Sequence, residues 1–229
     1  MEDDIFDYFR SLMQHRSALV FIFVGAHRLE EMTHDYWSIF FNIAIHQKIS
    51  YLKEDEARQL ITEPVAGSLE YEDYAVNKII RVTHCHPYFV QLICWALVNH
   101  CNACQRNYAT INDVNTVLDD ILVAGEAHFA YVWQQSSPWE RLVLAVLAKM
   151  LRPGKDYALL SEMEQALEVG GAILDKQEVV QHLNELCMRD VLGKEANGGL
   201  RYRFQIELVR LWIDQHKSIE EAIAGVTTT

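Results

Sequence analysis

The sequence predicts a mainly helical α+β fold with few strands. Most of the 229 residues lie in segments whose apolar side chains recur every three to four positions, the period of a helix buried on one face. In the first half of the chain, only Ala18–Gly25 and Gln47–Leu52 have strand patterns. The chain closes with three helical segments, a hairpin and a last helix, an order that predicts a winged helix-turn-helix.

Composition limits the class of protein. No apolar run approaches the ~20 residues that span a bilayer, and the acidic N-terminus has no signal-peptide pattern. We therefore expect no membrane contact and a cytoplasmic location. The five cysteines have no disulfide spacing, and the lone pair Cys101 and Cys104 lacks the second pair that zinc usually requires, so we expect no metal site. No catalytic residues can be paired from the sequence.

Charge is spread unevenly along the chain. The net charge is −12, and residues 1–136 hold 9 Lys and Arg against 18 Asp and Glu, a net of −9. An acidic first half argues against non-specific wrapping by nucleic acid.

The N-terminal elements suggest part of an α/β core. Asp3–His15 has the pattern of an amphipathic helix. Ala18–Gly25 is continuously apolar, as is typical of a strand covered on both faces. Arg28 follows that strand at the end where ligands bind in open α/β sheets, so it is a candidate phosphate sensor. The alternative is an exposed loop arginine.

From Lys53 onward the pattern is helical. Thr83–Leu97 holds the corner on which the prediction depends, because Pro87 opens a helix that is apolar nearly all round and should be the buried axis of its layer. The start of that helix suits a nucleotide or another anion. The alternative is a simple helical corner. The other helical segments before the connector are Lys53–Thr62, Tyr71–Val82 and Thr110–Val123.

The second half has clear boundaries. Ser137 and Glu140 form a capping box with Pro138 at the first helical position. The segment around Ala196–Gly199 predicts a β-hairpin. The expected elements are a connector at Glu126–Gln135, helices at Ser137–Leu151, Tyr157–Leu167 and Asp175–Arg189, hairpin strands at Val191–Lys194 and Arg201–Gln205, a helix at Glu207–His216, and a frayed tail from Ser218.

A winged helix raises DNA binding as an alternative function. On the helix that would enter the groove, Gln181 and Asn184 could contact bases, and Arg201 and Arg203 on the wing could contact phosphates. Because few other cations accompany them, DNA binding is not the favoured prediction.

The chain resembles the later part of STAND-class ATPases, which are AAA-related P-loop NTPases close to the origin-recognition ATPases. The resemblance rests on Ala18–Arg28, on Ile49–Ile61 with Pro64, and on Thr83–Gln91, and it extends in order to His216. It implies that Arg28 occupies the sensor-1 position and that Pro87, with His86, lines the adenine. Cys85 and His86 stand where the family has a glycine and a small polar residue.

The sequence lacks the parts of the family that hold phosphate. No G-x-x-x-x-G-K-[ST] motif and no apolar strand ending in Asp-Glu are present, so both Walker A and Walker B are missing. We therefore expect a C-terminal part of an ATPase module that is inactive alone. The resemblance implies ATP or ADP with Mg²⁺ in a longer parent, no cofactor for this chain alone, and a partner that is the missing P-loop half.

Together these patterns predict a fold, a set of domains and a function. The favoured function is the nucleotide-sensing, conformational-switch part of a STAND/AAA-type ATPase; the alternatives are a winged-helix DNA-binding module and an interaction scaffold that dimerises through open strand edges. The expected domains are a remnant of the P-loop core at 1–52, a helical lid at 53–124, a connector at 125–136, a winged helix at 137–217 and a flexible tail at 218–229.

Overall fold

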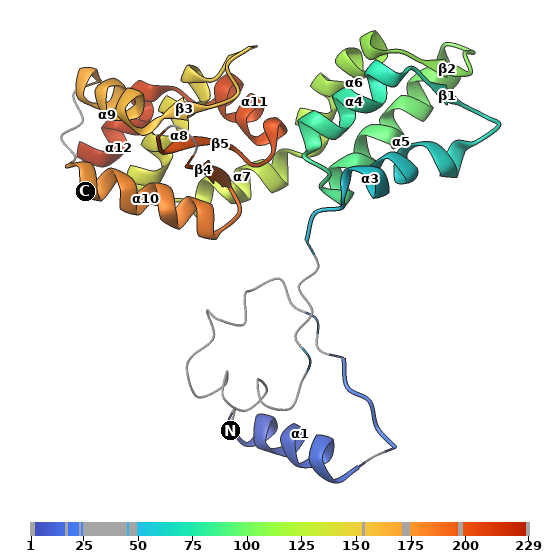
Figure 1. The fold of residues 1–229 in the computed structure, drawn as a ribbon, viewed down its shortest axis with the longest axis horizontal. Coiled ribbons are helices and arrows are strands. Elements are labelled where there is room, and N and C mark those ends of the chain that lie inside the picture. Colours follow the sequence, from blue (N-terminus) through green and yellow to red (C-terminus); the bar gives the residue numbers. More distant parts are fainter. Residues whose placement is uncertain are drawn as a thin grey trace. The chain divides into compact units, whose positions relative to one another are not determined.

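A computed structural model describes the chain at residues 3–16, 18–22, 24, 45, 50–152, 154–170, 175–196 and 199–227. The described residues are mainly helical, and their few short strands form two small sheets (Figure 1). This confirms the predicted mainly helical α+β class. The chain divides into two compact units, Met1–Ser50 and Tyr51–Thr229, which are described separately.

The first unit contains the predicted N-terminal helix, α1, at Asp3–His15. The strand predicted at Ala18–Gly25 is wrong for its described residues, 18–22 and 24, which belong to no strand. The side chains of Val20, Ile22 and Val24 are 88%, 84% and 91% exposed. The described part of Gln47–Leu52 is not a strand either. A buried strand needs hydrogen-bonded neighbours, and the described residues of this unit supply none.

The second unit begins with a helical bundle formed by residues 51–124. Its helices confirm the predicted ones within a few residues. Its strands β1 and β2 pair in parallel, with Glu70 opposite Tyr108 and Tyr71 opposite Ala109. The elements are α3 Glu54–Thr62, the short 3-10 helix η2 Glu63–Val65, β1 Glu70–Tyr71, α4 Asp73–Thr83, α5 Pro87–Ala103, β2 Tyr108–Ala109 and α6 Ile111–Ala124.

Helix α5 is buried on one side and not all round, which corrects the sequence-based expectation. Phe89, Ile93 and Leu97 are fully buried, whereas Trp95 is 64% exposed. Tyr88 is also exposed. The apolar composition of α5 exceeds what its neighbours α3, α4 and α6 can cover, so composition alone overestimated its burial.

The segment expected to be a connector, residues 125–136, is mostly helix α7, Glu126–Gln134. Phe129 is fully buried in it and stacks on Phe89 of α5 with ring centroids 5.4 Å apart. A Cβ at Gly125 would lie 2.8 Å from the Phe129 ring, so this close approach requires glycine.

The remaining elements, from residue 138 on, form what we call the C-terminal domain. The three strands are antiparallel in the order β3-β5-β4, with Leu192 opposite Phe204 and Glu195 opposite Arg201. The elements are α8 Pro138–Met150, β3 Ala158–Leu159, α9 Leu160–Val169, α10 Lys176–Met188, β4 Leu192–Glu195, β5 Arg201–Phe204, α11 Glu207–His216 and α12 Ile219–Thr227.

Helix α8 is the buried axis of this domain. Every residue from Leu142 to Ala148 is buried, because α9, α10, α11 and α12 all pack against this helix. The tail from Ser218, expected to be frayed, is instead α12. The Glu221 N–H donates to Ser218 Oγ (3.1 Å), and Ala222 is buried. Apolar residues at Ile219, Ala222 and Ile223 form the face that the sequence analysis overlooked.

Candidate functional site

The candidate site is the turn between α4 and α5, residues 83–87, where the predicted His86 and Pro87 lie. His84 and Cys85 have positive φ angles of 48° and 60°, a left-handed conformation that is costly for residues other than glycine. The turn is closed by two backbone hydrogen bonds of 3.0 Å, from His86 N–H to Thr83 O and from Leu52 N–H to Cys85 O. Strain of this kind is often found at functional sites.

Helix α5 begins without a side-chain cap. His86 is the N-cap residue and Pro87 the first helical residue, but the His86 side chain accepts no hydrogen bond from the first turn. The N-cap side chain therefore satisfies none of the N–H groups of the first turn, and the positive end of the helix dipole lies here.

Aromatic rings surround His86. Its ring centroid lies 5.3 Å from that of Tyr51, 5.2 Å from Phe89 and 6.3 Å from His128. Burial, and then the neighbouring His128, lowers the pKa of His86, and burial also lowers the pKa of His128. His86 Nδ1 is buried and has no hydrogen-bond partner among the described residues. The site therefore favours neutral imidazoles.

The neighbouring His84 contacts strand β5 of the C-terminal domain. Arg203 Nη1 and Nη2 lie 3.3 Å from His84 Nδ1 and Nε2. Burial and then the Arg203 charge lower the pKa of His84. The turn is thus in direct contact with the C-terminal domain, which the sequence analysis missed because no local pattern connects residues 119 positions apart.

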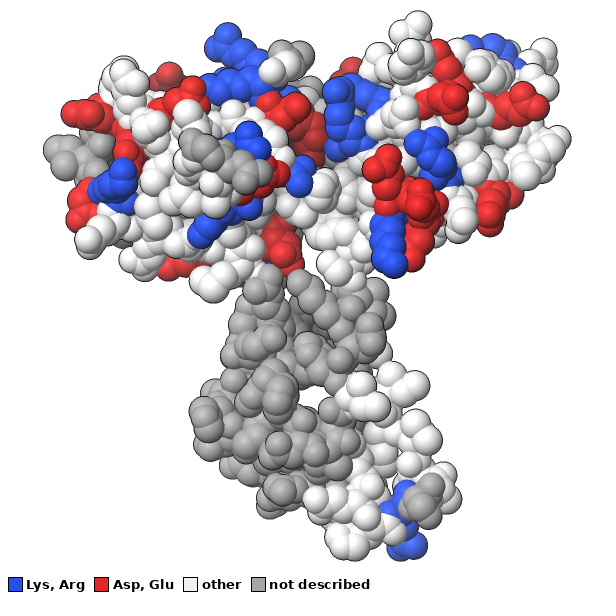
Figure 2. All heavy atoms as spheres, viewed as in Figure 1, with Lys and Arg blue, Asp and Glu red and all other residues white. Residues whose placement is uncertain are grey.

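The four residues predicted to contact DNA all have partners within the chain. Gln181 donates to Glu185 (3.0 Å), Asn184 accepts from Lys194 (3.0 Å), and Arg201 donates to Glu195 (2.6 Å), while Arg203 faces His84. On the face seen in Figure 2, positive and negative side chains are interspersed over the C-terminal domain without a continuous positive surface. Phosphate binding would have to compete with these pairs.

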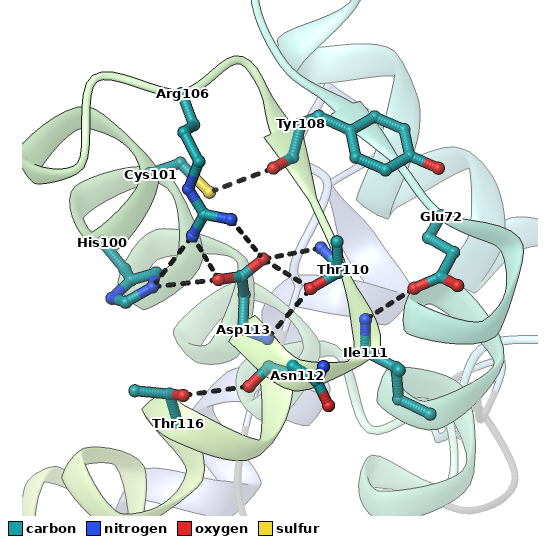
Figure 3. Close-up of polar contacts among 10 residues, drawn as sticks. All are labelled: Glu72, His100, Cys101, Arg106, Tyr108, Thr110, Ile111, Asn112, Asp113 and Thr116. Atoms are coloured by element: carbon teal, nitrogen blue, oxygen red, sulfur yellow. Dashed lines mark hydrogen bonds and ion pairs between the residues drawn. The ribbon is translucent and has the colours of Figure 1, made fainter.

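A second polar centre lies at the start of α6 (Figure 3). Asp113 is 5% exposed and accepts hydrogen bonds from Arg106, from Thr110 N–H (2.8 Å) and from Thr110 Oγ1 (2.7 Å). His100 Nε2 lies 3.1 Å from Asp113 Oδ1. Burial would raise the pKa of Asp113, but the bonds from Arg106, Thr110 and His100 outweigh it and hold the pKa well below the usual range. This saturated network is structural.

Of the predicted nucleotide-site residues, His86 and Pro87 lie together at the start of α5. Arg28 lies outside the described residues. The described residues hold no group of three His, Cys, Asp or Glu side chains that could bind a metal ion. In the same part of the chain, no helix has the length and apolarity needed to cross a membrane.

Comparison with known proteins gives limited likenesses. No family model and no curated protein matches the chain. Among solved structures, Cdc6p from Pyrobaculum aerophilum matches with a TM-score of 0.38 and 16% identity, over 97% of this chain and 63% of that one. Drosophila ORC bound to DNA matches with a TM-score of 0.30 and 12% identity, over 76% of this chain and 45% of that one. The chain thus spans less than two thirds of either protein, and TM-scores this low establish no shared family.

Proposed function

We propose that the chain is the nucleotide-sensing, conformational-switch part of a STAND/AAA-type ATPase, and that it is not catalytically competent alone. The observation that carries the proposal is the start of α5, where a left-handed turn leads into His86 and Pro87 and leaves the helix end without a side-chain cap. An uncapped helix start of this kind favours an anionic ligand. Pro87 and His86 would line the adenine, as the family resemblance implies.

The arrangement of the C-terminal domain supports a switch. Its order of α8, β3, α9, α10, β4 and β5, with the strands in the order β3-β5-β4, is the order expected for a winged helix. Arg203 on its wing strand contacts His84 in the turn that would hold the nucleotide. A ligand that changes this turn would therefore change the contact with the wing, as a two-state switch requires.

Titration of the whole chain with adenosine, ADP and ATP–Mg²⁺, followed by backbone amide NMR, tests the proposal. We expect weak binding that shifts the amide signals of Cys85, His86 and Tyr88. ADP and ATP–Mg²⁺ should bind only slightly more tightly than adenosine, because the helix start attracts their charge but no phosphate loop is present to hold the phosphates. The signals of Trp95 and Asn99, on the exposed side of the same helix, should stay unchanged.

The variant Pro87→Ala should weaken the response, and Pro64→Ala, near the start of the 3-10 helix η2, is its matched control. Absence of shifts at residues 85–88 with all three ligands would contradict nucleotide sensing by this turn. A strong preference for ATP–Mg²⁺, with a raised melting temperature, or ATP hydrolysis by the purified chain would contradict the proposed loss of phosphate binding and catalysis.

DNA binding by the winged helix is the alternative, supported by the strand order but opposed by the internal pairing of Gln181, Asn184, Arg201 and Arg203. Fluorescence anisotropy with duplex DNA distinguishes the two. Salt-sensitive binding that Arg201→Met weakens would favour the alternative. Dimerisation through open strand edges loses its basis in the described residues 18–22 and 24, which form no strand.

A further inference from the structure

The contact between His84 and Arg203 joins two parts of the chain that fold from distant segments. His84 is the C-cap residue of α4, and Arg203 lies on β5 with Arg201 two residues away on the same face of the strand. The two terminal nitrogens of the Arg203 guanidinium, Nη1 and Nη2, lie 3.3 Å from His84 Nδ1 and Nε2 respectively. The inference drawn from this contact goes beyond the proposed function, because no nucleotide enters it.

The groups around His84 come from several elements. Tyr51 lies against the imidazole with ring centroids 5.7 Å apart. Burial and then the charge of Asp190, in the turn between α10 and β4, raise the pKa of Tyr51 to about 12, so Tyr51 is neutral. Beyond Arg203 lies the ring of Tyr157, 5.7 Å from the Arg203 Cζ atom. Cys85 and His86 are the neighbours in the turn itself.

Two further charged residues near this contact, Arg201 and Glu195, form an ion pair with each other. Glu195 accepts hydrogen bonds from Arg201 (2.6 Å) and from the Tyr157 hydroxyl (2.5 Å). Among the described residues, Arg203 is therefore the charged side chain that contacts the His84 ring directly.

This contact depends on the protonation state of His84. A neutral imidazole has a nitrogen lone pair that can accept from a guanidinium, whereas a guanidinium can only donate. A protonated imidazole has two N–H donors and no acceptor, and its charge would lie 3.3 Å from another cation. Protonation thus converts the contact from attraction to repulsion.

We propose that the His84–Arg203 contact is a latch between the α4–α5 turn and the wing strand β5, and that protonation of His84 opens it. The closed form binds the proton less readily than the open form, so a fall in pH through the ordinary histidine range favours opening. Opening exposes Arg203, which then becomes available to an anion in solution.

NMR of the whole chain tests the latch without any nucleotide. The ring signals of His84 and the Nε–Hε signal of Arg203 are followed between about pH 8 and about pH 5. We expect His84 to titrate below the ordinary value of about 6.5, the Arg203 signal to shift with the same midpoint, and the nuclear Overhauser contacts between the two side chains to disappear. The Gln205 amide, bonded to Val191 O (3.0 Å), should remain protected because the sheet stays folded.

Three variants separate the latch from general effects of pH. Arg203→Met should raise the pKa of His84, whereas Arg201→Met, on the same face of β5, should not. His84→Asn keeps a residue that tolerates the left-handed conformation and should abolish the shift of the Arg203 signal.

Three results would overturn the proposal. The first is an Arg203 signal that does not respond while His84 titrates. The second is persistence of the contacts once His84 is protonated. The third is loss of Gln205 protection at the same midpoint, which would mean unfolding of the sheet. Because no nucleotide is added, none of these results bears on nucleotide sensing.

Discussion

Two turns of the helical bundle at residues 51–124 have similar compositions but opposite chemistry. The α4–α5 turn holds His84, Cys85 and His86, and the last turn of α5 with the connection to α6 holds His100, Cys101 and Cys104. In the second, a buried carboxylate is saturated with donors and the connected helix has a complete capping box. Both turns contain left-handed residues, His84 and Cys85 in the first and Gln105 in the second, but the helix that follows the first turn has no side-chain cap.

The two turns also prefer opposite charge states. Asp113, in the first turn of α6, is stabilised as an anion, because the hydrogen bonds that it accepts outweigh burial. The imidazoles of His84 and His86 are stabilised as neutral rings, because burial and neighbouring groups disfavour the charged form. A turn whose polar groups are fully paired holds the bundle together, whereas a strained turn with unpaired groups is able to respond to a ligand.

Removal of the carboxylate should have the largest effect on the bundle. Asp113→Ala deletes the partner of Arg106 and His100 as well as half of the α6 capping box. Loss of a cap costs about 1 kcal/mol and loss of hydrogen bonds to a charged group about 2 kcal/mol more. We expect the free energy of unfolding, measured with urea, to fall by roughly 3 kcal/mol.

Asp119→Ala is the matched control for this change, because Asp119 is an exposed carboxylate on the same helix. It should change stability by less than about 0.5 kcal/mol. Equal effects of the two substitutions would show that the α5–α6 network contributes nothing beyond helix propensity, and the contrast between the turns would fail.

The sequence predicted the elements of this region better than their contacts. Local signals are strong for helix starts: the capping box predicted at Ser137 is present, and α6 and α10 begin one residue after the predicted Thr110 and Asp175. The apolar run from Ala18 was wrongly predicted to be a strand, because strand formation depends on neighbouring strands that the run's own residues do not encode. The tail from Ser218 was predicted to be frayed, but it forms helix α12. Its apolar face is buried by packing against α8, a contact that the residues of the tail do not encode.

The candidate site was predictable only in part. His86 and Pro87 follow from a proline at the start of an apolar helix. Tyr51, His128 and Arg203 reach that turn from distant segments, and no periodicity or spacing brings them there. The left-handed residues were also missed, because histidine and cysteine do not signal that conformation as glycine does.

Relief of backbone strain in the α4–α5 turn should raise the free energy of unfolding by a moderate amount, opposite in sign to the effect of Asp113→Ala. Cys85 has a φ of 60°, and this conformation costs an L-residue about 1–2 kcal/mol. Glycine adopts it freely but loses more backbone entropy on folding, a cost of about 0.5–1 kcal/mol. We therefore expect Cys85→Gly to raise the free energy of unfolding by up to about 1 kcal/mol.

Cys85→Ala serves as its control, since it removes the same thiol but keeps a Cβ in the left-handed conformation. It should not stabilise the protein. A gain shared by both variants would assign the effect to the thiol, whose pKa burial and then Glu54 raise, and not to the backbone.

The pH dependence of stability should give the smallest effect and the sharpest contrast between the turns. The pKa values of His86 and His128 are lowered in the folded state, so the unfolded chain binds more protons near and below about pH 6.5. The free energy of unfolding should therefore fall as the pH is lowered from about 7 to about 5.

The variant His128→Phe keeps a ring beside Phe89 but cannot be protonated. It also removes the imidazole that helps to lower the pKa of His86. The free energy of unfolding of this variant should therefore decline less steeply with falling pH. Asp113→Ala should lower the whole curve without changing its slope in this range, because the Asp113 carboxylate loses its charge only at lower pH. Urea denaturation at several pH values measures both slopes, and a steeper change in Asp113→Ala than in His128→Phe would reverse the assignment of charge preference to the two turns.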